Sequence, residues 1–135
     1  MDDRTMKHSF MWYQLPALLW ALLIYVSSSI PSERIPDFSI FRFDKAIHFC
    51  LYFLFSLFTY RALRYQDRFP RVARHALSLT LLAIVAYGAS DEIHQYFVPG
   101  RQADVHDLLA DTLGACVLVA GVWWKEWTKA PPRSD

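Results

Sequence analysis

Hydrophobic residues cluster in four long segments of this 135-residue chain, and polar residues fill the stretches between them. Two of the segments, "PALLWALLIYV" and "ALSLTLLAIVAYGA", have no polar face at the period of an α-helix. A soluble helical bundle keeps such a face toward water, whereas a helix that is apolar on every side is buried in a large core or a membrane. The pattern therefore favours membrane spans over a soluble four-helix bundle.

The lengths of the segments support the same interpretation. A helix needs about 20 residues to cross a bilayer, with a lower limit near 17. The second and fourth segments reach this length only when polar residues at their ends belong to the helices. The predicted spans cover residues 10–30, 44–63, 76–98 and 105–124. We therefore expect an all-α, integral membrane four-helix bundle, formed as a single domain by residues 1–135.

The first segment has an alternative interpretation as a cleaved signal peptide. Arg4 and Lys7 precede it, and the small residues Ser27, Ser28 and Ser29 follow its apolar core. Its apolar stretch is long for the hydrophobic region of a signal peptide, and three further spans come after it. We therefore expect the first span to be retained.

Basic residues set the predicted orientation, because cytoplasmic loops carry an excess of lysine and arginine. One side of the chain carries Arg4, Lys7, the arginines of a basic loop at residues 61–75, Lys125, Lys129 and Arg133, and the other side carries Arg34, Arg42, Lys45 and Arg101. We expect both termini and the basic loop in the cytoplasm, and the polar residues after the first and third spans outside it. A hydrophobic content of 54% fits a lipid bilayer as partner. No strongly basic face is present, so nucleic acid is not an expected partner.

The start of the second span contains a polar stripe. Asp44, His48 and Tyr52 are spaced four residues apart, so they lie on one face of a helix. Asp44 and Lys45 are also explained by an ordinary helix start, with an acid at the positive end of the helix dipole and a lysine in the head-group region. That explanation does not cover His48, which lies one turn deeper.

Two acids lie near the end of the third span. Asp91 and Gln95 share one helical stripe, and Gly88 and Glu92 lie on the neighbouring stripe. A carboxylate costs about 2.5–3.5 kcal/mol at the centre of a bilayer, so such residues are expected to face the bundle interior and to have a partner. The alternative is that the helix leaves the membrane at Ser90 and that both acids are solvated.

A turn and a further acidic stripe follow. The sequence "VPGR" predicts a type II turn, which places Arg101 either as a counter-charge for nearby carboxylates or as a fork for an anionic head group. The fourth span then presents Asp104, Asp107, Asp111 and Gly114 at intervals of three, four and three residues. Asp104 is explained as a helix cap, and Asp107 partly by the helix dipole. Asp111 lies deeper and needs another explanation.

Four motifs together resemble the VanZ-like family of small bacterial membrane proteins. They are "LLIYVSSSIPS", "DKAIHFCLYF", "SDEIHQYFVPGR" and "DLLADTLGA", and the resemblance covers roughly residues 17–122. It implies a multi-pass protein of the bacterial inner membrane, in a family whose namesake is associated with resistance to the antibiotic teicoplanin. The recurrent polar positions of the family fall on Asp44, Lys45, His48, Tyr52, Glu92, Gln95, Arg101, Asp107 and Gly114. Many relatives have asparagine where this chain has Asp111, which adds a negative charge.

These patterns predict an outward-facing polar pocket. It comprises Asp44, Lys45, His48, Tyr52, Asp91, Glu92, Gln95, Arg101, Asp107 and Asp111. The favoured function is non-enzymatic binding of a glycopeptide or a lipid-linked cell-wall precursor, with an effect on teicoplanin susceptibility. The first alternative is a metal-dependent hydrolase of polyprenyl phosphates, since acids and histidine suit metal binding and acid–base chemistry, although no HExxH or GxSxG signature is present. The second is a proton- or ion-coupled carrier that uses Asp91, Glu92 and Asp111.

The sequence predicts no cofactor, and a divalent metal at the acidic and histidine cluster is the alternative to that prediction. Small residues permit close helix packing at Gly88, Gly114 and Gly121. The same positions are compatible with a homo-oligomer.

Overall fold

The computed structural model describes residues 10–34 and 44–129, and this part of the chain is all-helical. Its elements are η1 (Phe10–Gln14), α2 (Leu15–Ser28), η2 (Ser32–Arg34), α3 (Asp44–Arg64), α4 (Pro70–Arg74), α5 (Ala76–Tyr96) and α6 (Val105–Lys129). Four helical stretches are long and apolar enough to cross a membrane: Phe10–Ser28, Lys45–Arg64, Ala76–Tyr96 and Val105–Lys129. The predicted all-α architecture, with four helices long and apolar enough to span a membrane, is confirmed.

The ends of all four predicted spans differ from those observed: the first and third helices stop earlier, at Ser28 and Tyr96, and the second and fourth continue further. The basic segment at residues 61–75 is not a simple loop, because α3 continues to Arg64 and the short helix α4 occupies Pro70–Arg74. Helix α6 also continues beyond residue 124 to Lys129. The apolar pattern underestimates α6 because polar residues at a membrane interface interrupt the pattern without interrupting the backbone hydrogen bonds.

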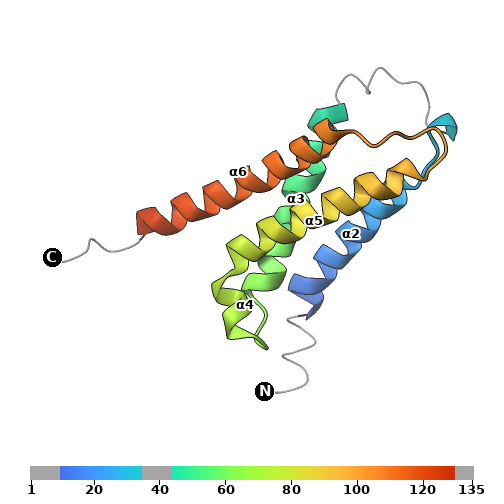
Figure 1. The fold of residues 1–135 in the computed structure, drawn as a ribbon. Helices are drawn as coiled ribbons and strands as arrows, with labels where there is room; N and C mark the ends of the chain where they lie inside the picture. The colour runs from blue at the N-terminus through green and yellow to red at the C-terminus, as the bar shows by residue number, and fades with distance from the viewer. Residues whose placement is uncertain (1–9, 35–43, 130–135) are drawn as a thin grey trace.

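The other three long helices pack around α3. It contacts α2, α5 and α6, and α5 also contacts α2 and α6, whereas α2 and α6 make no direct contact within the described residues. In Figure 1, α2, α3 and α5 lie side by side, and the C-terminal part of α6 diverges from α5. The main core cluster joins Ile24, Tyr52, Phe55, Ile84 and Ala115. Most buried residues therefore lie on α3, α5 and α6, with α2 covering one side.

The outer surface of the bundle is apolar. Large hydrophobic side chains of α2, such as Leu18 and Leu22, are 58% and 56% exposed. Contiguous apolar surface of this kind is unusual on a soluble monomer and is expected where helices face hydrocarbon. Trp123, Trp124 and Trp127 are also exposed near the end of α6, as expected for an aromatic belt at a membrane interface.

A close approach between α3 and α6 depends on Gly114. A Cβ atom at Gly114 would lie 2.6 Å from the backbone oxygen of Phe49 and 2.9 Å from the backbone nitrogen of Phe53. Backbone atoms cannot move aside cheaply, so only glycine permits this separation. Gly121 differs, because a Cβ atom there would meet nothing within 4 Å among the described residues. The packing role predicted for Gly121 therefore has no counterpart within the chain and stays a prediction about an oligomer.

The two ends of the bundle differ in chemistry. At one end α2 and α5 finish and α3 and α6 begin, and the predicted pocket residues lie there (Figure 1). At the other end lies the arginine-rich connection between α3 and α5. We refer to these as the acidic end and the basic end. That the acidic end faces away from the cytoplasm stays a prediction.

Candidate functional site

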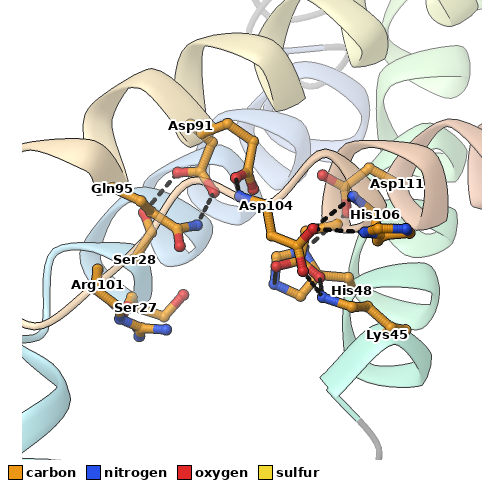
Figure 2. A network of polar contacts seen from close by, with 12 residues as sticks. Ser27, Ser28, Lys45, His48, Asp91, Gln95, Arg101, Asp104, His106 and Asp111 are labelled. Carbon is orange, nitrogen blue, oxygen red and sulfur yellow. Dashed lines mark hydrogen bonds and ion pairs between the residues drawn. The ribbon is translucent and has the colours of Figure 1, made fainter.

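Helices α3 and α6 are joined by a ladder of ionisable side chains at the acidic end (Figure 2). Lys45, in the first turn of α3, forms ion pairs with Asp104 at 2.6 Å and with Asp107. One turn deeper, Nδ1 of His48 lies 3.0 Å from Oδ1 of Asp111. The predicted stripe on α3 therefore faces the predicted stripe on α6. The side chain of Asp44 lies outside the described residues.

Helices α2 and α5 are joined by a second set of hydrogen bonds around Asp91. The Ser28 hydroxyl donates to Oδ1 of Asp91 at 2.6 Å, and Nε2 of Gln95 donates to Oδ2 at 3.0 Å. Helix α5 continues to Tyr96, and Asp91 is only 5% exposed. Glu92 is likewise only 6% exposed, so the alternative in which both acids are solvated is wrong. The level at which α5 leaves the membrane stays a prediction.

Ser28 is a site residue that the sequence did not reveal. Its serine cluster has an ordinary interpretation as small residues after a hydrophobic segment, so the hydroxyl carried no distinct signal. Its position along the bundle could have indicated this role, since the last turn of α2 and the last turns of α5 lie at the same end of the bundle. An acid buried in α5 needs a donor at that level, and α2 supplies one.

Three buried oxygens in the middle of the site have no hydrogen-bond partner among the described residues. They are Oε1 of Glu92, Oδ2 of Asp111 and the hydroxyl of Tyr52. Glu92 is 6% exposed, and its other oxygen, Oε2, accepts the backbone N–H of Asp104 at 2.7 Å. Most buried polar atoms in folded proteins are hydrogen-bonded, so a group of unpaired oxygens requires an explanation.

One of the unpaired oxygens, Oδ2 of Asp111, lies beside Gly88. A Cβ atom at Gly88 would lie 3.1 Å from Oδ2 of Asp111 and 3.4 Å from Cε1 of Tyr52. The missing side chain lets α5 approach these groups closely. His48, Glu92 and Asp111 each place a potential metal-ligand atom within 4.8 Å of the others. The site thus brings one imidazole and two carboxylates together from three helices.

The predicted type II turn after α5 is confirmed. The Arg101 backbone N–H donates to the Val98 oxygen at 3.1 Å, and Gly100 has a φ of 74°. That angle is the one expected at the third position of a type II turn, where glycine is favoured. A Cβ atom at Gly100 would also lie 2.1 Å from Oγ of Ser32. The positive φ therefore favours glycine here, and a larger residue would also displace the Ser32 side chain.

The turn directs Arg101 toward the end of α2. Its Nε donates to the backbone oxygen of Ile30 at 3.2 Å, and its Nη2 donates to that of Ser27 at 3.3 Å. No carboxylate among the described residues forms an ion pair with Arg101. The sequence left two roles open for Arg101. The structure does not show it as a counter-charge for nearby carboxylates, so the role as a fork for an anionic head group stays a prediction.

Two adjoining cavities lie beside this arginine. The outer cavity, of about 480 Å³, is lined by Ser32, His48, Gln95, Gly100, Arg101, Gln102, Ala103, Asp104 and Asp107. The inner cavity, of about 170 Å³, is lined by Ile24, Ser27, Ser28, Ile47, His48, Leu51, Tyr52, Asp91, Gln95 and Arg101. His48, Gln95 and Arg101 line both. A single molecule can therefore contact the polar outer cavity and the more apolar side chains of α2 and α3.

The charges at the acidic end are unequally balanced. Hydrogen bonding from Lys45, and then from the N–H of His106, lowers the pKa of Asp104 below its usual range. Asp107 shares the Lys45 charge. Glu92 and Asp111 have no lysine or arginine partner among the described residues, and His48 is the basic side chain nearest to them.

The predicted pocket residues with described side chains all lie at this end of the bundle. Those brought into direct contact are Lys45, His48, Asp91, Gln95, Asp107 and Asp111, while Tyr52, Glu92 and Arg101 complete the surroundings. The sequence missed Ser28 and the backbone oxygens of Ser27 and Ile30.

Comparison with known proteins agrees with the motifs and with this architecture. A family model described as VanZ/LLP1 matches residues 4–126. No curated protein and no solved structure matches the chain. Because the family model covers most of the sequence, this helical membrane protein belongs to the VanZ/LLP1 family.

Proposed function

We propose that this protein binds the anionic head group of a lipid-linked cell-wall precursor at the outer face of a bacterial inner membrane. The observation that carries the proposal is the state of Arg101. Two backbone oxygens hold its guanidinium in place, and no described carboxylate neutralises it. It is the one lysine or arginine among the described residues that line the two cavities.

An arginine held in this way is suited to phosphate. Guanidinium presents a planar fork of N–H donors that matches the oxygens of phosphate or carboxylate, and these charge-assisted bonds are stronger than neutral ones. The carbonyl oxygens of Ser27 and Ile30 occupy donors at Nε and Nη2 and leave other N–H groups for a ligand. Lys45 is less suited, because Asp104 and Asp107 already balance its charge.

The cavities favour a lipid over a fully water-soluble ligand. The outer cavity is bounded mainly by polar residues, whereas Ile24, Ile47 and Leu51 line part of the inner cavity. Ile47 is 39% exposed, so this apolar lining continues onto the outer surface of the bundle. A phosphate in the outer cavity would leave the attached chain free to follow α2 and α3. Bound precursor would be less accessible to a glycopeptide, which links the proposal to teicoplanin susceptibility.

The proposal is tested by equilibrium binding to purified protein in lipid nanodiscs. The probe is a fluorescently labelled polyprenyl phosphate, and labelled teicoplanin is measured separately. Loss of a hydrogen-bonded charge costs about 1.5–3 kcal/mol, so Arg101→Ala should bind polyprenyl phosphate about 10- to 150-fold more weakly. Arg71→Ala, at an exposed position of α4 at the basic end, is the matched control and should bind normally.

Either of two results would contradict the proposal. One is wild-type protein that does not bind polyprenyl phosphate, and the other is Arg101→Ala with unchanged affinity. Binding of teicoplanin alone would indicate that the glycopeptide itself is the ligand.

The convergence of His48, Glu92 and Asp111 favours a second candidate, a metal-dependent hydrolase of lipid phosphates. A bound metal ion would polarise a phosphoryl oxygen or activate water, and Arg101 would hold the phosphate nearby. The test is phosphate release from polyprenyl diphosphate by protein supplied with Zn²⁺ or Mn²⁺. Absence of turnover by metal-loaded protein would exclude this candidate and leave head-group binding intact.

A further inference from the structure

Two buried carboxylates near His48 have no lysine or arginine partner among the described residues. Glu92 and Asp111 are 6% and 0% exposed, and each keeps one oxygen without a partner among the described residues. An ionised carboxylate is strongly disfavoured in a buried place unless it is paired or binds a metal. The other buried acids have partners: Asp91 has Ser28 and Gln95, and Asp107 has Lys45. Among the described buried acids, only these two therefore keep a carboxylate oxygen without a hydrogen-bond partner.

The geometry around the pair is close to that of a metal centre. One ligand atom each from His48, Glu92 and Asp111 lies within 4.8 Å of the others. Bonds of about 2.0–2.2 Å to a divalent ion would bring such atoms to roughly 3–4 Å from one another. The difference is less than about 2 Å, which small side-chain rotations supply.

We propose that His48, Glu92 and Asp111 bind a divalent first-row transition-metal ion, of the Zn²⁺ or Mn²⁺ type. An imidazole together with two carboxylates suits these ions, whereas Mg²⁺ and Ca²⁺ prefer oxygen ligands alone. The ligand oxygens are the unpaired ones, Oε1 of Glu92 and Oδ2 of Asp111. A charge of +2 balances both carboxylates at once.

Binding of His48 and Asp111 to one ion would replace their present contact, in which Nδ1 of His48 lies 3.0 Å from Oδ1 of Asp111. An existing hydrogen bond already orients Glu92, whose Oε2 accepts the Asp104 backbone N–H at 2.7 Å. Hydrogen bonds of this kind fix the direction of a metal ligand and are typical of metal sites. The ligands come from α3, α5 and α6, so a bound ion would join three of the four long helices.

The metal site does not depend on the proposed head-group binding. Arg101 is not among its ligands, so Arg101→Ala should lose lipid binding and keep metal binding. If metal binding fails while Arg101-dependent lipid binding holds, the metal inference alone is wrong. The reverse result would remove the head-group proposal alone.

The test measures metal bound by purified protein without an affinity tag that binds metal. After dialysis against Zn²⁺ or Mn²⁺, mass spectrometry of the elements should find about one equivalent in the wild type. Glu92→Gln and Asp111→Asn should each bind at least about 100-fold more weakly, since each loses a charged ligand. Asp67→Asn is the control, because it removes an exposed acid at the basic end, and it should bind normally.

A second measurement keeps the test decisive if a variant does not fold. Binding to the native state alone raises the melting temperature, by an amount that grows with ligand concentration. Wild-type protein in detergent should melt at a higher temperature with Zn²⁺ or Mn²⁺, and a chelator should reverse the shift. Wild-type protein with neither bound metal nor a melting shift would overturn the inference. Equal metal affinity in wild type and both variants would overturn it as well.

Discussion

The Asp111 carboxylate faces the His48 imidazole across the α3–α6 interface, with Oδ1 and Nδ1 3.0 Å apart. The two residues lie 63 positions apart in the chain and on different helices. Asp111 is completely buried, and its second oxygen has no partner among the described residues. This contact links α3 and α6 one turn deeper than the ion pairs of Lys45.

The close α3–α6 approach predicts that Gly114→Ala destabilises the protein. The added Cβ atom would lie 2.6 Å from the Phe49 oxygen, so the helices would have to separate. Overpacking of this kind costs about 1–3 kcal/mol. Gly121→Ala is the control and should be neutral or slightly stabilising, since its Cβ atom meets nothing described and alanine favours a helix. Unfolding in detergent measures the stability of both variants. An equal effect of the two substitutions would contradict the close approach of α3 and α6 at Gly114.

The hydrogen bond from Ser28 to Asp91 predicts that Ser28→Ala also destabilises the fold. Removing the donor leaves a buried carboxylate oxygen unpaired, which costs about 1–3 kcal/mol. Ser27→Ala is the matched control, because the Ser27 hydroxyl donates to the Ile24 oxygen of its own helix and the residue is exposed. The melting temperatures of the two variants should differ. Similar values would mean that Ser28 does not pair with Asp91.

The lowered pKa of Asp104 predicts a stability difference that depends on pH. A carboxyl group whose folded-state pKa is depressed stabilises the fold above its unfolded pKa, about 3.9, and loses that contribution as the pH falls below it. Asp104→Asn keeps an acceptor for the His106 N–H and removes the charge that pairs with Lys45. The variant should melt below wild type at pH 6, and the gap should shrink below about pH 4. A gap independent of pH would contradict this.

The predicted orientation can be checked by labelling single cysteines in spheroplasts. Gln102 and Asp67 are both exposed, at the acidic and basic ends respectively. With Cys50 and Cys116 replaced, Gln102→Cys should react with a membrane-impermeant maleimide, and Asp67→Cys should react only after lysis. The opposite result would place the acidic end in the cytoplasm.

The sequence predicted the helices because hydrophobic segments of this length have few alternatives in a bilayer. It also predicted which acids need partners, since helical spacing places Asp111 and Glu92 on inward stripes. It did not identify Ser28 as the partner of Asp91, because that contact depends on how α2 is rotated against α5. The sequence also did not distinguish Gly114 from Gly121. Only Gly114 lies where α3 and α6 approach closely, and that point depends on how the two helices cross. The turn before Arg101 was predictable from the sequence. The backbone oxygens that Arg101 contacts were not, because they belong to a segment distant in sequence.

Head-group recognition through Arg101 is tested most directly by comparing two ligands that differ only in phosphate. Affinities for polyprenyl phosphate and for the same polyprenol without phosphate are measured with wild type, Arg101→Ala and Arg101→Lys in nanodiscs. The wild type should prefer the phosphate by about 10-fold or more, Arg101→Lys should keep part of that preference, and Arg101→Ala should lose it. Equal affinity of the wild type for the two ligands, or an undiminished preference in Arg101→Ala, would contradict binding of the phosphate by Arg101.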